Sequence, residues 1–188
     1  MDYTKIKERL KETLSEEKYL HSLETAENAK KISQIVGYED VEKAYLAALL
    51  HDCAKCIKKD ELKVIAQELD YVTEDEKTMP KTLHAPVGKM IAKRDYNIED
   101  EEILSAIRFH TVARKNMTML EMIVFLSDKI REEFGTKYFG KDAFEFIQDV
   151  GIEKAMAKAI QNGMDYLAEK GANPARLTVE AFEYFRKF

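Results

Sequence analysis

Apolar residues recur at three- and four-residue spacing along almost the whole chain, and little interrupts them. Only seven Gly and three Pro occur among 188 residues. This spacing is typical of amphipathic helices, and the abundant Ala, Leu, Glu and Lys favour the same conformation. We find no segment with convincing period-two alternation and no internal repeat. The sequence therefore predicts an all-α fold, a single helical bundle.

Residues typical of helix ends place several of the boundaries. Ser15 is a suitable N-cap, and Gly37 is a typical residue just beyond a helix C-terminus. Asp40 and Asp60 are predicted to cap the next two helices, and the polar residues 71–83 are predicted to form a loop. We expect helices over residues 4–13, 15–36, 41–51, 61–69, 84–95, 99–110, 118–134, 141–150, 152–170 and 178–187.

Composition excludes several classes of protein. The apolar fraction of 45% can build a core, and the net charge of −5 does not suit a general nucleic-acid binder. The longest uncharged apolar stretch, residues 44–50, is far shorter than a transmembrane helix, and the charged N-terminus lacks a signal-peptide core. Two cysteines cannot staple a fold of this size, which indicates a reducing, cytoplasmic setting. We expect no membrane and no nucleic acid as partners.

The chain has four histidines, and each falls on a different predicted helix or helix end. They are His21, His51, His84 and His110. Helical bundles build interior metal sites in this way, from side chains on facing helices. His51 is followed directly by an acid, Asp52.

Two carboxylates lie in segments that are expected to be buried. Asp52 ends one apolar run, and Asp128 follows another. A buried, unpaired carboxylate costs several kcal/mol. Lys129 or Arg131 could pair with Asp128, which is the ordinary explanation. A metal ion would satisfy both acids and the histidines together, and the four candidate ligands are His21, His51, Asp52 and Asp128.

This ordered set on helices resembles the HD-domain superfamily of metal-dependent phosphohydrolases. Within it, five segments resemble the bacterial YqeK family, whose members are symmetric diadenosine tetraphosphate hydrolases. These segments are His21-Ser22-Leu23, Leu49-Leu50-His51-Asp52-Cys53-Ala54-Lys55, Leu83-His84-Ala85-Pro86-Val87-Gly88, Ala106-Ile107-Arg108-Phe109-His110-Thr111 and Leu126-Ser127-Asp128-Lys129-Ile130. The resemblance spans about residues 16–134. It implies one HD-type hydrolase domain over residues 1–188, with the helices of about 141–188 packed on a metal-binding core.

The resemblance also implies the site. Two metal ions, iron in the family, would be bound by His21, His51, Asp52, His84, His110 and Asp128, with Asp52 bridging them. The ligand types alone also suit manganese or zinc. Such a pair would make water acidic enough to act as a nucleophile on a polyphosphate.

A net negative chain needs local cations to bind a polyphosphate substrate. Lys55 lies one turn beyond Asp52 if the helix continues, and it resembles the phosphate-facing lysine of the family. Arg108 and Thr111 flank His110 and are further candidate substrate contacts. We therefore expect Asp52 and Lys55 to serve catalysis, and Lys55, Arg108 and Thr111 to bind the substrate.

Two short stretches depart from the family pattern. Val112-Ala113 stand where the family usually has Thr-Gly, and Arg131-Glu132-Glu133 stand where it tends to have Glu-Pro-x-Arg. Neither stretch includes a proposed ligand. Both lie where phosphates are expected, so they bear on the exact substrate.

Other motifs have ordinary interpretations. Cys53-Ala54-Lys55-Cys56 matches a redox or zinc pattern, but the βαβ context and a second cysteine pair are lacking. Phe134, Tyr138 and Phe139 could stack on adenine, although core or dimer packing is the ordinary role of such residues.

The sequence also fits rival functions. An HD-domain nucleotidase acting on deoxynucleoside monophosphates needs only four ligands and one metal, so His84 and His110 distinguish it from the two-metal enzyme. A helical module that binds metal or nucleotide without turnover is a non-enzymatic alternative. A cyclic-dinucleotide phosphodiesterase is disfavoured because its Gly-Tyr-Pro signature is lacking. The expected partner is a small nucleotide, with a homodimer as a possible assembly.

Overall fold

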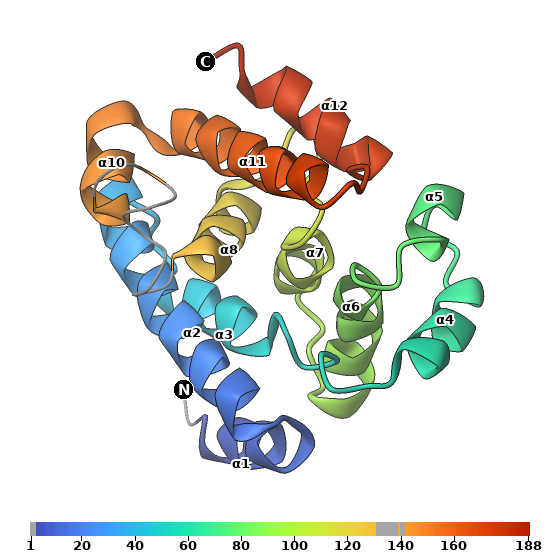
Figure 1. Ribbon diagram of the computed structural model, residues 1–188. Coiled ribbons are helices and arrows are strands. Elements are labelled where there is room, and N and C mark those ends of the chain that lie inside the picture. The colour runs from blue at the N-terminus through green and yellow to red at the C-terminus, as the bar shows by residue number, and fades with distance from the viewer. Residues whose placement is uncertain (1–2, 131–138, 140–141) are drawn as a thin grey trace.

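Helices form all the long regular elements of the computed structural model, which describes residues 3–130, 139 and 142–188 (Figure 1). They are α1 (Thr4–Thr13), α2 (Glu16–Val36), α3 (Val41–Leu50), α4 (Lys59–Gln67), α5 (Glu74–Lys77), α6 (His84–Asp95), α7 (Glu101–Phe109), α8 (Met119–Lys129), α10 (Ala143–Val150), α11 (Ile152–Glu169) and α12 (Arg176–Phe185). These residue ranges contain no strand. The prediction of an all-α fold is confirmed.

The predicted caps of α2 and α3 are present. The Ser15 hydroxyl accepts the N–H of Lys18 at 3.4 Å, and the Asp40 carboxylate accepts the N–H of Lys43 at 2.9 Å. Gly37 ends α2 with φ = 68°, a left-handed conformation that glycine adopts without a Cβ clash. Ser15 and Gly37 therefore set the two ends of α2, the longest described helix.

The predicted start of α4 and end of α8 are wrong. Lys58 is the N-cap residue of α4, so Asp60 lies inside the first turn, where an acid favours the helix dipole. Helix α8 ends at Lys129 because Ile130 is extended, and its carbonyl accepts the Asn28 side-chain amide at 2.9 Å. The rest of the predicted helix, over 131–134, falls outside the described residues.

The predicted loop at 71–83 contains the short helix α5. Thr73 and Glu76 form a capping box at its start, in which the Glu76 carboxylate accepts the N–H of Thr73 at 3.2 Å. A four-residue helix is too short to show a hydrophobic period, so the spacing of apolar residues does not reveal it. Its contacts nevertheless matter for the site described below.

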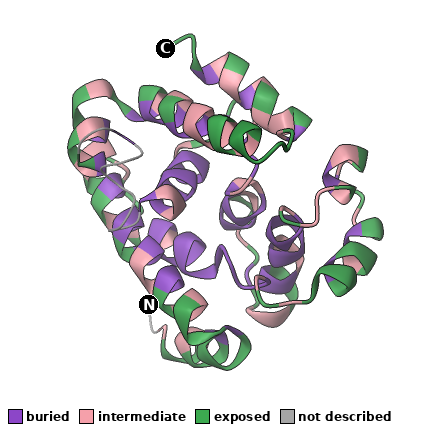
Figure 2. Cartoon of the chain, viewed as in Figure 1, coloured by how far each residue is buried: buried purple, intermediate pink, exposed green. Residues whose placement is uncertain are grey.

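The centre of the bundle is formed by α3, α7 and α8, where purple ribbon predominates in Figure 2. Every residue from Ala44 to Leu50 of α3 is buried. Helix α2 packs on α3 and α8, and α6 packs on α7. Helices α11 and α12 lie across one end of the bundle (Figure 1). The buried core runs as one cluster from Leu10 to Phe185. None of the described helices combines the length and apolarity needed to cross a bilayer.

Candidate metal centre

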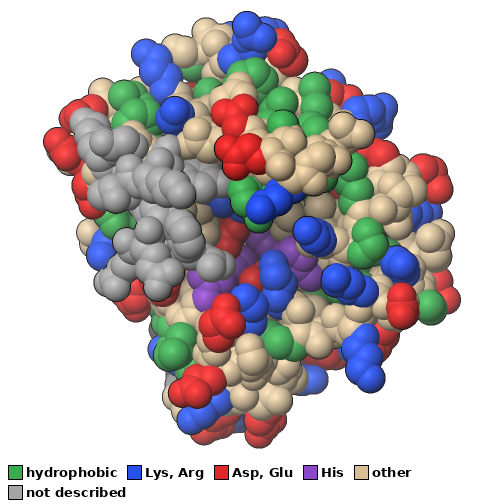
Figure 3. Space-filling model, in the orientation of Figure 1, with side chains coloured by type: hydrophobic (Ala, Val, Ile, Leu, Met, Phe, Trp, Pro, Cys, Tyr) green, Lys and Arg blue, Asp and Glu red, His purple; other side chains and the backbone are tan. Residues whose placement is uncertain are grey.

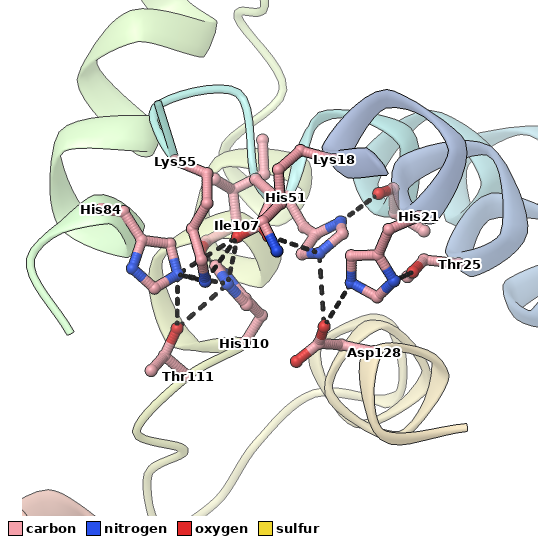
Figure 4. A network of polar contacts seen from close by, with 12 residues as sticks. Lys18, His21, Thr25, His51, Lys55, His84, Ile107, His110, Thr111 and Asp128 are labelled. Atoms are coloured by element: carbon pink, nitrogen blue, oxygen red, sulfur yellow. Dashed lines mark hydrogen bonds and ion pairs between the residues drawn. The ribbon is translucent and has the colours of Figure 1, made fainter. Parts of the chain in front are cut away.

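The six ligands implied by the resemblance gather at one place, although they come from five helices or helix ends. His21 is on α2, His51 and Asp52 follow α3, His84 opens α6, His110 ends α7, and Asp128 is near the end of α8. The four histidine side chains and that of Asp128 point toward one another (Figure 4), and the Asp52 carboxylate lies among them, 3.2 Å from His84 Nε2. On the molecular surface the histidines lie at the bottom of a hollow, with Lys and Arg side chains beside them (Figure 3).

One group of donors consists of His21, His51 and Asp128. The Asp128 Oδ1 atom lies 2.9 Å from His21 Nε2 and 3.4 Å from His51 Nε2. These atoms are close enough together to hold one metal ion. The other carboxylate oxygen of Asp128 pairs with Lys129 Nζ at 2.6 Å, so the ordinary explanation accounts for only one of its two oxygens. Arg131 falls outside the described residues.

A second group surrounds the buried carboxylate of Asp52. Its Oδ1 atom lies 3.2 Å from His84 Nε2 and 3.4 Å from His110 Nε2. Its Oδ2 atom faces the other way, 3.6 Å from His51 Nε2. His51, Asp52 and His110 also meet the distance requirement for a metal site. The Asp52 carboxylate therefore stands between the two groups, with one oxygen toward each.

Three of the imidazole rings are oriented by the chain just before them. His51 Nδ1 donates to the Ala48 carbonyl at 2.6 Å. His84 and His110 donate in the same way to the carbonyl three residues earlier, at 3.0 Å and 2.7 Å. The last carbonyls of a helix lack i+4 partners, so a histidine at the end of α3 or α7 supplies a further donor to one of them. Each ring, when neutral, then presents an unprotonated Nε2 to the centre.

The donor set fits a bound cation. His84 Nε2 and His110 Nε2 lie 3.2 Å apart, and since both Nδ1 atoms carry the proton, two lone pairs face each other. His51 Nε2 is buried and has no hydrogen-bond partner among the described residues. Burial lowers the pKa of His110 to about 3, which keeps the ring neutral, as a metal ligand must be. Imidazole with carboxylate suits iron, manganese or zinc.

Lys55 and Thr111 lie at the second group. Lys55 Nζ is 2.9 Å from His84 Nε2 and 3.3 Å from Asp52 Oδ1. The Thr111 hydroxyl is 3.2 Å from His84 Nε2 and 3.0 Å from His110 Nε2. Helix α3 does not continue to Lys55, because residues 51–56 form successive turns. These turns still place Lys55 beside Asp52, since the N–H of Lys55 bonds the Asp52 carbonyl at 2.9 Å.

Arg108 does not join the cluster. Its side chain is 3% exposed, and Nη2 pairs with the Glu76 carboxylate at 2.7 Å. This arrangement joins α7 to α5 inside the protein.

Lys18 is a cation near the site that the sequence analysis did not select. It lies on α2, one turn before His21, and its amino group points toward the histidines beside that of Lys55 (Figure 4). Its ion-pair partner is Glu17, at 2.9 Å, whose side chain is 78% exposed. The three-residue spacing to His21 was the available signal, because such residues share a helix face.

The remaining motifs have structural roles. Cys53 and Cys56 are free thiols, and the metal-compatible groups found among the described residues include neither. Phe139 is 4% exposed and packs against Phe146, with ring centroids 5.4 Å apart, so it belongs to the core. Phe134 and Tyr138 fall outside the described residues.

Comparison with known proteins agrees with this geometry. The sequence pattern of the HD domain family matches residues 19–133, which include every ligand above. The chain belongs to the HD-domain family. This HD-domain chain is 33% identical over 168 residues to a protein of Bacillus subtilis (strain 168) named symmetrical bis(5'-nucleosyl)-tetraphosphatase, covering 86% of this chain and 85% of that protein.

Two further relatives cover nearly the whole HD-domain chain. A Staphylococcus aureus protein of the same name is 31% identical over 190 residues, covering 98% of this chain and 95% of its own length. A crystal structure described as a predicted HD superfamily hydrolase involved in NAD metabolism, from Clostridium acetobutylicum, superposes with a TM-score of 0.88 at 32% identity. It covers 100% of this chain and 98% of the other. The resemblance to this branch of the HD-domain family is confirmed.

Proposed function

We propose that the chain hydrolyses diadenosine tetraphosphate symmetrically, to two molecules of ADP, at a centre that holds two cations. The main observation behind this proposal is that the Asp52 carboxylate lies between the two groups of donors. Its two oxygens face different groups of donors, at 3.2 Å from His84 Nε2 and 3.6 Å from His51 Nε2. The names of the relatives support the substrate. We assign His21, His51 and Asp128 to one cation, His84 and His110 to the other, and Asp52 to both.

The residues around this centre have different roles in the proposed reaction. Bound divalent cations supply Lewis acidity, which activates water near neutral pH and stabilises charge on phosphoryl oxygens. Asp52 fixes the spacing of the two ligand groups. Lys55 and Lys18 bind the polyphosphate, since a chain of net charge −5 would otherwise repel it. Thr111 orients a phosphate oxygen through its hydroxyl. ADP leaves as a weak base, so a strong general acid is not required.

Product analysis tests the reaction. Purified protein supplied with iron or manganese should convert diadenosine tetraphosphate to ADP alone. Formation of ATP and AMP would contradict symmetric cleavage. Turnover of deoxynucleoside monophosphates instead would favour the nucleotidase, and no turnover with any metal would favour a binding module.

Metal content separates the one-metal and two-metal interpretations. The protein should bind two cations per chain, and His84→Ala should bind one, because it removes a ligand of the second group only. Metal analysis of dialysed protein provides the measurement. One cation in both proteins would exclude the two-metal centre. We propose iron as the metal, with manganese and zinc as alternatives to be compared in the same experiment.

Lys18 should affect substrate binding more than turnover. Lys18→Ala should raise KM for diadenosine tetraphosphate by roughly 10-fold, the loss expected for one charge-assisted hydrogen bond, with kcat little changed. Steady-state kinetics measures both constants. Lys11→Ala, at an exposed lysine of α1, is the matched control and should leave KM unchanged. An unchanged KM in Lys18→Ala would remove Lys18 from the substrate site.

A cytoplasmic location, a homodimeric assembly and a single domain over residues 1–188 remain predictions. Gel filtration of the purified protein tests the assembly.

A further inference from the structure

The segment of residues 71–83 leads directly into His84, a ligand of the second group. Within it, the Lys81 carbonyl accepts the proton of His84 Nδ1 at 3.0 Å. This contact fixes the tautomer of the ring and the direction of Nε2. The orientation of the His84 ring therefore depends on the position of the 71–83 segment.

One buried guanidinium nitrogen holds this segment at two points. Arg108 Nη2 donates to the Glu76 carboxylate at 2.7 Å and to the Tyr71 carbonyl at 3.1 Å. Arg108 is 3% exposed and Glu76 is fully buried. The other nitrogens of Arg108, Nε and Nη1, have no hydrogen-bond partner among the described residues, so this attachment depends on Nη2.

The remaining polar attachments of the segment are nearer the surface. The Tyr71 hydroxyl donates to the Pro86 carbonyl at 3.1 Å, and the Asp75 carboxylate accepts the N–H of Arg176 at 2.9 Å in an exposed position. Water competes with such contacts, whereas it does not reach the Arg108–Glu76 pair. The buried pair is therefore the main polar anchor of the segment.

Arg108 also lies two residues before His110 on α7. The same helix end thus carries one ligand of the second group and holds the segment that orients the other. His84 Nε2 and His110 Nε2 lie 3.2 Å apart.

We propose that Arg108 is a positioning residue for the second cation. Through Glu76 and the Tyr71 carbonyl it holds the 71–83 segment so that the Lys81 carbonyl keeps His84 Nε2 aimed at Asp52 and His110. This role takes the place of the direct substrate contact that was expected from the position of Arg108 beside His110 in the sequence. The catalytic consequence rests on the two-cation centre of the proposed function.

The test compares two arginines that both pair with a fully buried glutamate. Arg108→Lys keeps the charge but not the geometry of the planar group. Arg114→Lys is the matched control, because Arg114 pairs with Glu121 at 2.9 Å at the start of α8. Arg108→Lys should weaken binding of the second cation by roughly 10- to 100-fold and leave the first unchanged, as measured by metal titration. It should lower kcat and leave KM unchanged, and Glu76→Gln should act in the same direction.

A second readout needs neither metal nor substrate. In the metal-free protein, the Nδ1 proton of His84 should give a protected imidazole signal in 15N–1H spectra. Arg108→Lys should abolish that signal and retain the corresponding signal of His110. The proposal is overturned if His84 keeps its signal, if both cations weaken equally, or if KM rises with metal affinity unchanged. If the wild-type protein bound only one cation, the proposed two-cation centre would be wrong. The imidazole signal of His84 would still test whether Arg108 positions that ring.

Discussion

Replacing Asp52 with asparagine should abolish hydrolysis, with kcat falling by roughly 10³-fold or more, because the carboxylate serves both ligand groups. An amide has nearly the same shape but carries no charge and offers one oxygen instead of two. Both cations should therefore bind more weakly, whereas His84→Ala should affect one. Rate measurements at saturating substrate, with metal analysis of the same samples, provide the check.

The control for this substitution is an aspartate outside the site. Asp60→Asn, at a side chain that is 98% exposed, should leave the rate and the metal content unchanged. An Asp52→Asn protein that holds two cations with wild-type affinity would show that Asp52 does not join the two groups.

Arg108→Met should be the most destabilising of the substitutions considered. It leaves the carboxylate of Glu76, which is fully buried, without its counterion. Removing one partner of a buried ion pair costs about 3–5 kcal/mol, which lowers Tm by about 10 °C in a chain of this length. Denaturant and thermal unfolding of the metal-free protein measure the loss without interference from cation binding.

A double substitution separates the buried charge from other effects. Arg108→Met combined with Glu76→Leu should recover most of the loss, since no unpaired charge then remains inside the protein. Full recovery is not expected, because Glu76 also closes the capping box with Thr73, worth about 1 kcal/mol. A double variant as unstable as Arg108→Met alone would show that packing, not charge, accounts for the loss.

Helices with strong local signals could be predicted from the sequence, and those without them could not. Ser15 and Asp40 mark true starts because each precedes a helix and has a backbone N–H within reach three residues later. Asp60 carries the same signal but lies inside α4. An acid at the N-cap and an acid in the first turn are both favourable, so residue type alone does not distinguish them. Helix α5 was visible only through the spacing of Thr73 and Glu76.

The site shows a similar division between short and long side chains. The six proposed ligands have short side chains on helices or at helix ends, so their order along the chain was informative. Arg108 was also chosen from its place in a motif, yet its long side chain reaches Glu76, in a segment predicted to be a loop. Lys18 was passed over although it shares a face with His21. The direction of a long, flexible side chain depends on neighbours that only the fold supplies.

His21 and Asp128, the first and last of the proposed ligands, are 107 residues apart in the chain and touch in the fold. A cation bound as proposed would link α2 to α8 and, with Asp52 as a shared ligand, to α3, α6 and α7. Such an ion acts on the polypeptide as a reversible cross-link, since it binds the folded chain and not the unfolded one. The supply of metal would then govern how long each molecule survives unfolding and proteolysis, as well as whether it is active.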